Sequence, residues 1–396
     1  MTSVLIAYSD TGGGHRSAAI ALEEALRLER PDVATTLIDP FAACPRWPFR
    51  SLSSMYPHLI DSAAWLWHAG FTLTNTPHRT ALCQKLAWPA LRATFRAIAD
   101  AHTPDVVVST HPLLTESLRR AFPTIPIVVV VTDLISGHAS WYNRRVEFTV
   151  VPTLRARERA IAARLDGTRV ATLGLPVSKR FVVGSSEKSA LRKPLGWRQD
   201  RPTVLLAGGA EGMGALETLA DAIDRAQLPC DLAVIAGRNT QLAMRLRKRE
   251  WQNTVHVYDF VHNLPEMMRA GAAVVTKAGP GTISESCASG CPMVLYGAIP
   301  GQETGNVAFV TDGGAGVWAP SPLAVTNALR NWLVGDDASA ALRRASTAAR
   351  QLARPDAAPD IALRVLMTVR SPRPRVDANG ASSKPRPSVV LRSAVA

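Results

Sequence analysis

Short apolar segments recur along the first half of the chain and alternate with more polar stretches. They are rich in Val and Ile and bounded by turn residues, and they lie at residues 4–8, 35–38, 105–109, 127–132, 148–152 and 170–173. A glycine turn and a stretch of helical periodicity at residues 17–30 follow the first run. Apolar runs of this length are typical of parallel strands that are buried on both faces. Their alternation with helices predicts a doubly wound parallel sheet.

The same pattern restarts after residues 178–201, a stretch of lower apolar density that we interpret as a linker. The second series of apolar runs lies at residues 203–207, 232–236, 255–258, 273–276 and 292–296. The predicted fold class is therefore α/β, with two Rossmann-like doubly wound domains, residues 1–177 and 202–355, that face a cleft. Residues 356–370 have a helical pattern and could cross back to the first domain. Residues 371–396 are rich in Pro, Ser and Arg, and we expect a disordered basic tail there.

Length and composition suit this organisation. The chain has 396 residues, of which 47% are hydrophobic. The longest apolar run, residues 125–131, is far shorter than the roughly 18–20 residues that a bilayer-spanning helix needs. The first strand follows the N-terminus directly, so we expect neither a signal peptide nor a transmembrane helix. The five cysteines form no Cys-x-x-Cys pair, which argues against a disulfide framework or a structural zinc site.

The charge balance points to an anionic partner. The chain carries 45 basic and 32 acidic residues, a formal net charge of +13. Nucleic acid, an anionic membrane or a phosphorylated substrate would each suit this charge. Residues 44–96 narrow the choice, because they interleave basic residues with Trp47, Trp65, Trp67 and Trp88. Aromatic and basic residues in one insertion favour a membrane surface, although a helical pair packed over the sheet would explain them too.

A glycine turn with a histidine follows the first strand, in the run SDTGGGHR at residues 9–16. Gly13 and Gly14 let the backbone approach a ligand closely, and the helix that follows presents its N-terminus. We predict that His15 points into the cleft at the carboxyl end of the sheet, where it could take a proton from an attacking hydroxyl. The structural alternative is a histidine at the helix start that is bonded to a backbone carbonyl.

A second strand, turn and helix start lies at residues 276–285. Gly279 and Gly281 expose backbone amides in the turn Gly279-Pro280-Gly281-Thr282. With the Thr282 hydroxyl and the helix N-terminus, they would form a cradle for a diphosphate. Glu285, one helical turn later, could accept hydrogen bonds from both hydroxyls of a ribose. The simpler interpretation is a tight turn without a ligand.

Polar side chains follow the strand at residues 292–296. Gln302, Glu303 and Asn306 bring together amide and carboxylate groups that suit recognition of sugar hydroxyls by hydrogen bonding. Three lesser features complete the predicted site: the glycine loop at residues 208–214, which includes Gly209, the run Gly237-Arg238-Asn239, and the pair Phe260-Val261, which could hold a uracil.

Taken together and in order, these runs resemble a known family. The runs SDTGGGHR, STHP, VVTDL, GLP, GGAEGMG, FVHNLPEMM, TKAGPGTISES and IPGQETGN are similar to those of the monogalactosyldiacylglycerol synthases and processive diacylglycerol glucosyltransferases. The N-acetylglucosaminyltransferase of peptidoglycan synthesis is similar more remotely. The resemblance covers residues 4–320. It implies a GT-B fold, UDP in the C-terminal domain, an acceptor site in the N-terminal domain, and inversion at the sugar carbon.

The resemblance also implies roles for single residues. His15 would be the catalytic base, Gly279–Thr282 would hold the diphosphate, Glu285 the ribose, and Phe260-Val261 the uracil. Gln302, Glu303 and Asn306 would hold the sugar, while Asp133 and His138 would line the acceptor side. Asp133 or Asp10 could orient His15. The chain departs from the family pattern at Ala210, where a third glycine is usual, and we expect its methyl group to be accommodated.

The predicted activity is inverting transfer of a hexose, galactose or glucose, from a UDP-sugar to diacylglycerol or a related lipid, on the cytoplasmic face of the cell membrane. No Asp-x-Asp occurs, so we expect neither a metal nor another cofactor, and no nucleic-acid partner. Three alternatives stay open: a soluble glycosyltransferase acting on a small molecule, a UDP-sugar 2-epimerase, and a non-enzymatic basic binding module. The sequence leaves the sugar, the lipid and the oligomeric state undetermined.

Overall fold

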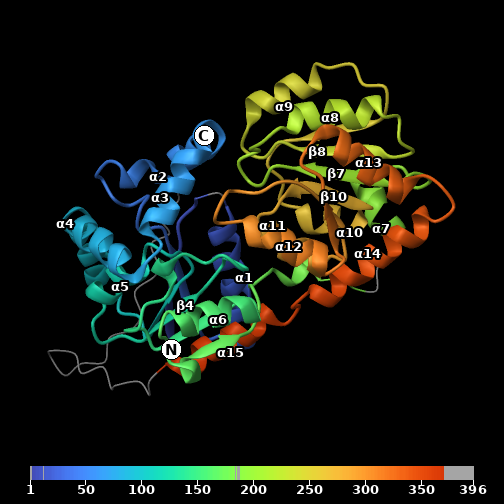
Figure 1. The fold of residues 1–396 in the computed structure, drawn as a ribbon. Helices are drawn as coiled ribbons and strands as arrows, with labels where there is room; N and C mark the ends of the chain where they lie inside the picture. Colours follow the sequence, from blue (N-terminus) through green and yellow to red (C-terminus); the bar gives the residue numbers. More distant parts are fainter. Residues whose placement is uncertain (1, 12, 183, 185–187, 370–396) are drawn as a thin grey trace.

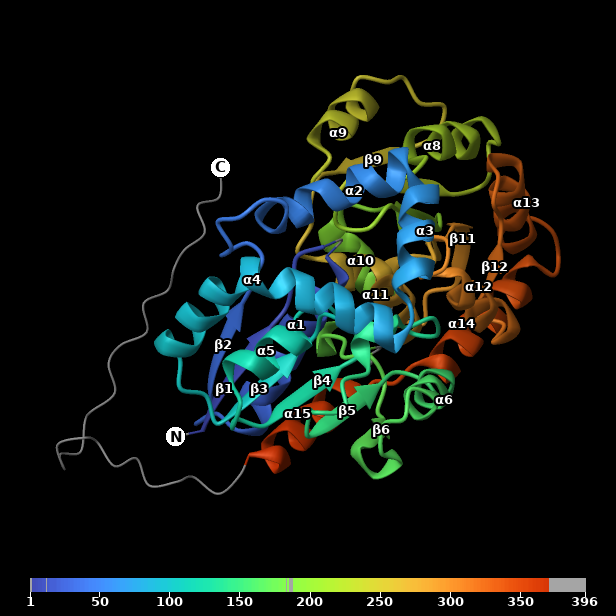
Figure 2. The same cartoon turned by 60° about the vertical axis from the view of Figure 1, so that its left-hand side comes forward.

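The computed structural model describes residues 2–11, 13–182, 184 and 188–369, and these form two α/β domains (Figures 1 and 2). The N-terminal domain contains a parallel sheet of order β2-β1-β3-β4-β5-β6. Its strands are β1 (Ser3–Ala7), β2 (Ala34–Ile38), β3 (Val106–Ser109), β4 (Ile127–Val130), β5 (Phe148–Val151) and β6 (Val170–Thr172). Three of its helices are α1 (Gly14–Glu29), α5 (Thr115–Ala121) and α6 (Leu154–Ala162).

The C-terminal domain repeats this plan with a parallel sheet of order β12-β11-β10-β7-β8-β9. The strands are β7 (Thr203–Ala207), β8 (Asp231–Ile235), β9 (Val255–Tyr258), β10 (Ala273–Lys277), β11 (Met293–Gly297) and β12 (Gly316–Trp318). The helices are α8 (Leu216–Arg225), α9 (Thr240–Arg247), α10 (Leu264–Ala270), α11 (Pro280–Ala288), α12 (Thr304–Asp312), α13 (Pro322–Leu333) and α14 (Ala338–Leu352). The predicted doubly wound α/β class is therefore confirmed.

Burial of both sheet faces explains why the strands read as unbroken apolar runs. Neighbouring residues of β1, Leu5 and Ile6, point to opposite faces and are both buried, as are Leu205 and Leu206 of β7. In each sheet the strand order changes direction beside the first strand, between β1 and β3 and between β7 and β10. Ligands of open α/β sheets bind at such positions. The glycine turns that follow β1, β7 and β10 therefore lie where the topology predicts a site.

The aromatic and basic insertion forms three helices, α2 (Leu52–Ser62), α3 (Ala64–Thr74) and α4 (Pro77–Ala101). Helix α4 begins with Pro77 after Thr76, whose hydroxyl accepts a hydrogen bond from the Arg79 amide. It packs against the sheet through Leu91 and Phe95, as a helix covering the sheet would. Helices α2 and α3 instead extend toward the C-terminal domain (Figures 1 and 2). None of the described residues of α3 is fully buried.

Two segments join the domains. Residues 178–201, predicted as a linker, include the short helix α7 (Lys188–Arg192), and Phe181 and Trp197 pack into the C-terminal core. Helix α15 (Ala357–Thr368) returns to the N-terminal domain and packs beside α1 (Figure 1). The two crossings meet at Gly174, where a Cβ would lie 2.7 Å from the Arg354 Cβ. The predicted basic tail at residues 371–396 lies outside the described residues.

Among the helices described here, none combines the length and the apolar character that crossing a bilayer requires.

The docking of α15 can be tested with two substitutions on the same helix. Ile361 is fully buried against the N-terminal core, whereas Met367 is 73% exposed. We expect Ile361→Ala to destabilise the N-terminal domain by ~2–5 kcal/mol, because it leaves a cavity. Met367→Ala should change stability by less than about 0.5 kcal/mol. Urea unfolding measures both, and equal effects would contradict the packing of α15.

Candidate active site

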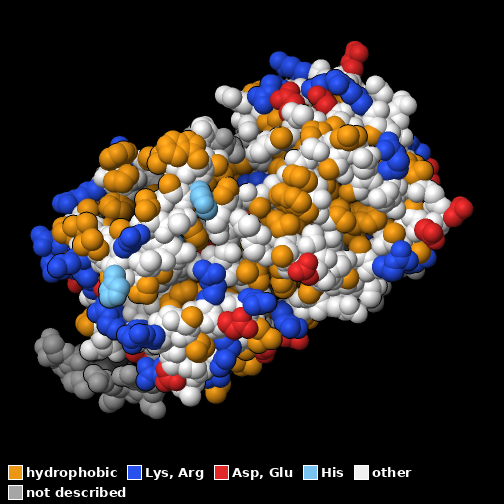
Figure 3. All heavy atoms as spheres, in the orientation of Figure 1, with side chains coloured by type: hydrophobic (Ala, Val, Ile, Leu, Met, Phe, Trp, Pro, Cys, Tyr) orange, Lys and Arg blue, Asp and Glu red, His pale blue; other side chains and the backbone are white. Residues whose placement is uncertain are grey.

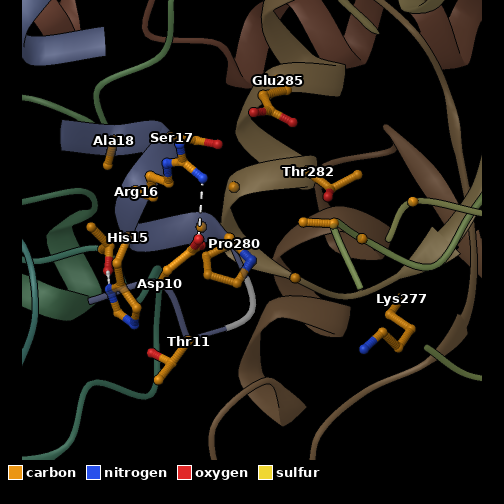
Figure 4. Close-up of a pocket in the computed structure, with 18 of the residues that line it drawn as sticks. Asp10, Thr11, His15, Arg16, Ser17, Ala18, Lys277, Pro280, Thr282 and Glu285 are labelled. Carbon is orange, nitrogen blue, oxygen red and sulfur yellow. Dashed lines mark hydrogen bonds and ion pairs between the residues drawn. The ribbon is translucent and has the colours of Figure 1, made fainter. Parts of the chain in front are cut away.

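A cavity of about 1300 Å³ lies between the domains. The carboxyl ends of both sheets and the inner sides of α2 and α3 surround it. Figure 4 shows His15 and Asp10 of the N-terminal domain on one side, facing Pro280, Thr282 and Glu285 on the other. The cavity therefore brings the two predicted glycine-rich sites together.

The glycine turn before α1 meets the C-terminal domain directly. Gly13 has a φ of +82°, which favours glycine, and a Cβ on it would lie 2.6 Å from the Cβ of Ala210. A Cβ on Gly281 would lie 3.7 Å from the Gly14 Cα. The methyl group of Ala210, the departure from the family pattern, thus packs against this turn. A side chain at Gly13 would push this turn away from the loop that contains Ala210.

His15 is held by its Nδ1 atom at the start of α1. Nδ1 lies 2.8 Å from the Thr110 carbonyl oxygen and 2.8 Å from the Thr132 hydroxyl oxygen. A carbonyl oxygen only accepts hydrogen bonds, so Nδ1 carries the ring proton and Nε2 is left with its lone pair. No partner of Nε2 lies among the described residues. The carbonyl bond of the structural alternative is present, and it leaves Nε2 as the ring atom that can accept a proton.

This arrangement corrects one prediction. Neither Asp133 nor Asp10 forms a hydrogen bond with His15; Thr110 and Thr132 orient the ring instead. The Asp133 carboxylate, which is buried, accepts hydrogen bonds from Trp141 Nε1 at 2.6 Å and Gln302 Nε2 at 3.3 Å. Asp133 therefore acts on His15 through its charge and not through a hydrogen bond.

Burial lowers the pKa of His15 below its usual 6.5, and the charge of Asp133, the bond to Thr110 and the charge of Asp10 oppose this in part. His111 lies beside it, with the ring centroids 4.5 Å apart. Burial, with a further contribution from His15, holds the pKa of His111 well below 6.5. Both imidazoles are therefore neutral at neutral pH.

His111 had no predicted role, although it lies in the run STHP after β3. Its Nδ1 accepts the Leu113 amide at 3.3 Å, so its Nε2 donates to the Thr11 hydroxyl at 3.2 Å. It thereby fixes one end of the glycine turn and one side of the His15 ring. The sequence did carry a signal for His111 as a site residue, because it is a polar residue that follows closely after a buried strand.

The turn after β10 provides the opposite wall. Helix α11 begins at Pro280, and Gly279, Gly281 and Thr282 line the cavity. Glu285 also lines it, and burial raises the pKa of its carboxyl group to about 7. Hydrogen bonds from ligand hydroxyls would stabilise the ionised form of such a group.

The predicted sugar-binding group divides in two. Gln302 and Glu303 line the cavity, and Glu303 accepts the Ile299 amide at 2.9 Å. Burial raises the pKa of Glu303, against the opposing charge of Lys277. Asn306 does not line the cavity: its side chain is buried and donates to the Ala278 carbonyl at 2.9 Å. Asn306 thus supports the turn after β10 from behind, which corrects its predicted contact with the sugar.

Asn239 requires a similar correction. Its Oδ1 accepts the Leu242 amide at 3.0 Å, so it caps α9 and does not face the cavity. Gly209, Phe260 and Val261 do line the cavity on this side. Gly209 has a φ of +77°, with open space where a Cβ would be.

Arg238, next to Asn239, had no predicted role, and it places a cation at the cleft. Its guanidinium donates to Asp10 across the cleft at 3.0 Å, pairs with Glu211, and lies 5.4 Å from the centre of the Phe260 ring. Asp10 also pairs with Arg16 at 3.2 Å. A basic residue at the turn after β8 indicated a charged cleft, but its partner in the other domain depends on how the domains meet.

Two facing Rossmann-like domains around a cleft, with a histidine on one wall and a glycine-rich helix N-terminus on the other, form the GT-B fold of glycosyltransferases. The chain belongs to the monogalactosyldiacylglycerol synthase family. Residues 15–177 match the family model "Monogalactosyldiacylglycerol (MGDG) synthase", and residues 203–316 match "Glycosyltransferase family 28 C-terminal domain". A probable monogalactosyldiacylglycerol synthase 2 of Oryza sativa subsp. indica is 34% identical over 378 residues, covering 91% of this chain and 79% of that protein.

Solved structures agree on the fold. MurG of Acinetobacter baumannii has a TM-score of 0.55 at 14% identity, over 93% of this chain and 100% of that one. The UDP-GlcNAc 2-epimerase of Neisseria meningitidis, bound to UDP-GlcNAc, has a TM-score of 0.59 at 12% identity, over 92% of this chain and 100% of that one. A transferase and an epimerase share this architecture, so the likeness shows the fold and does not choose an activity.

The protonation state of His15 is directly measurable. Because its folded-state pKa lies below 6.5, we expect the imidazole to be neutral at pH 6.5 and to gain a proton only at lower pH. NMR of ring nitrogens should show the proton on Nδ1, with His15→Ala identifying the signal. Protonation would also reduce stability, which is lost as the pH falls from 6.5 through the folded-state pKa. A charged ring at pH 7 would contradict the assignment.

Proposed function

We propose that this protein transfers a hexose from a UDP-hexose to a hydroxyl of diacylglycerol or a related lipid, with inversion at the anomeric carbon. The observation that carries the proposal is the position of His15. Its Nε2 is unpartnered among the described residues, and its ring lines the same cavity as the Gly279–Thr282 turn. A base and an anion-binding helix N-terminus on opposite walls suit displacement of a phosphate leaving group.

The donor is held by the C-terminal domain in this proposal. The backbone amides of Gly279, Gly281 and Thr282, at the N-terminus of α11, bind the diphosphate. Glu285 accepts the ribose hydroxyls, while Phe260 and Val261 contact the uracil. The epimerase with the same fold was solved with UDP-GlcNAc bound, which supports a UDP-sugar as donor.

The chemical step needs one base and one stabilised leaving group. The acceptor hydroxyl loses its proton to His15 Nε2 as its oxygen forms a bond to the anomeric carbon. The bond from that carbon to the β-phosphate oxygen breaks on the opposite face, and its electron pair leaves with UDP. The α11 N-terminus stabilises the new charge, with Lys277 nearby on the cavity wall. We propose that these groups act without a divalent cation.

The acceptor is proposed from the family and from the N-terminal wall of the cavity. The rice relative is named as a monogalactosyldiacylglycerol synthase, which points to diacylglycerol. Helices α2 and α3 line their side of the cavity with Leu59, Leu66 and Phe71, an apolar surface that suits acyl chains.

The outer surfaces of α3 and α4 support binding at a membrane. Trp65, Leu73 and Leu86 are 74%, 60% and 71% exposed. Figure 3 shows hydrophobic side chains gathered over this part of the N-terminal domain, with Lys and Arg side chains beside them. Apolar groups bordered by cations suit the interface of an anionic bilayer.

The activity is tested by incubating purified protein with UDP-galactose or UDP-glucose and diacylglycerol vesicles in EDTA, with products analysed by mass spectrometry. We expect a hexosyl-diacylglycerol. His15→Ala should reduce transfer by at least about 10²–10⁴-fold, because it removes the base, while UDP still binds. His102→Ala, outside the cavity, is the matched control. Full activity of His15→Ala would contradict the assigned base, and activity that needs added Mg²⁺ would contradict the proposed metal independence. Release of an epimerised sugar without an acceptor would favour the epimerase alternative.

Membrane binding is tested by sedimentation with vesicles containing phosphatidylglycerol, compared with neutral phosphatidylcholine. Replacing both Trp65 and Leu86 by Ser should weaken binding about tenfold or more, because two large apolar groups no longer enter the bilayer. The matched control replaces Trp318 and Leu323, exposed residues of the C-terminal domain, by Ser. Equal binding by both double variants would favour the soluble enzyme. Salt-sensitive DNA binding without UDP binding would favour the basic binding module.

A further inference from the structure

A hydrogen bond joins the domains beside the catalytic histidine. The side-chain amide of Gln302 in the C-terminal domain donates from Nε2 to Asp133 Oδ1 of the N-terminal domain at 3.3 Å. Gln302 stands in the loop between β11 and α12, and Asp133 follows β4. Both side chains line the cavity. The contact therefore links a residue of the donor-binding domain to the domain that carries His15.

The chemistry of Asp133 fixes how the Gln302 amide is turned. An ionised carboxylate only accepts hydrogen bonds, so the NH₂ group of Gln302 must face Asp133 and the Oε1 atom must face away. Oε1 is buried, and it has no hydrogen-bond partner within the described part of the chain. A buried acceptor without a partner is costly, and a ligand that donates a hydrogen bond would satisfy it.

Asp133 is itself held firmly. Its other oxygen, Oδ2, accepts the indole N–H of Trp141 at 2.6 Å, and Trp141 is fully buried. The Trp141 ring centroid lies 6.1 Å from that of His15. The carboxylate cannot turn away without leaving the indole N–H unpaired, so the oxygen that it presents to Gln302 has a fixed position.

We propose that Asp133 is a positioning residue that turns the Gln302 amide so that Oε1 accepts a hydrogen bond from a hydroxyl group of the donor hexose. The inference rests on the proposed UDP-hexose donor. Asp133 thereby gains a role in reading the sugar, from the domain opposite the donor. Because Gln302 is oriented only when the two domains meet, the sugar is read in the closed cleft.

The test changes which hydrogen-bond donors and acceptors residue 133 presents, without changing the size of its side chain. In Asp133→Asn, the introduced amide must present its oxygen to the Trp141 N–H and its NH₂ to Gln302. Gln302 then turns its own oxygen toward that NH₂ and presents an NH₂ group to the sugar. The matched control is Asp200→Asn, an exposed aspartate paired with Arg198.

Equilibrium binding without acceptor is the measurement, because the charge of Asp133 also influences the pKa of His15 and would confuse a rate. Calorimetry compares UDP, UDP-galactose and UDP-glucose. For the wild-type protein we expect one UDP-hexose to bind more tightly than UDP. In Asp133→Asn and in Gln302→Ala, the ratio of the affinity for this UDP-hexose to the affinity for UDP should fall about 10- to 100-fold. This is the effect expected from leaving one buried polar group unpaired. Affinity for UDP itself should not change.

The double variant Asp133→Asn with Gln302→Glu separates positioning from a general loss of structure. The introduced glutamate can accept from the introduced asparagine with one oxygen and face the sugar with the other. We expect it to recover most of the gain that Asp133→Asn loses. A thermal unfolding temperature equal to that of the wild-type protein would show that each variant is folded.

Two results overturn the inference and leave the proposed function intact: UDP-hexose selectivity over UDP that survives in Asp133→Asn, or loss in that variant without recovery in the double variant. Absence of UDP binding by the wild-type protein would instead contradict the proposed function, and this inference with it.

Discussion

The hydrogen bond from His15 Nδ1 to the Thr110 carbonyl is the interaction on which the site depends. It selects one tautomer of a neutral imidazole and leaves Nε2 as the acceptor. The carbonyl belongs to the residue that follows β3, and the histidine begins the helix that follows β1, so two neighbouring strands of the sheet determine the geometry. Burial of the ring beside His111 keeps it uncharged, which a base requires before it takes a proton.

The second half of the site depends on how closely the domains approach. Gly14 and Gly281 lack side chains where the turn before α1 meets the turn after β10, so these two turns lie close together. Two polar contacts, Asp10 with Arg238 and Asp133 with Gln302, cross the cleft around them. The close approach of the two domains therefore leaves little room for side chains between these turns. It also brings the polar partners within hydrogen-bonding distance of each other.

The sequence predicted the fold well, because burial on both faces of a parallel sheet leaves an unbroken apolar run for each strand. It predicted where the glycine turns lie for the same reason, since they follow those strands. It failed where a side chain had a local alternative. Asn239 satisfies a helix cap and Asn306 a backbone carbonyl, and neither bond can be told from a ligand contact by residue type alone. The contacts of Asp133 and Arg238 with the opposite domain depend on packing between distant segments, for which spacing along the chain gives no signal.

The two connections between the domains have a mechanical consequence. One crossing leaves the N-terminal domain after β6, the other returns between α14 and α15, and they touch at Gly174 and Arg354. Because the two connections touch there, the domains are held together at that place. Any rotation of one domain relative to the other would therefore displace groups beside Gly174 least and groups at the far rim of the cleft most.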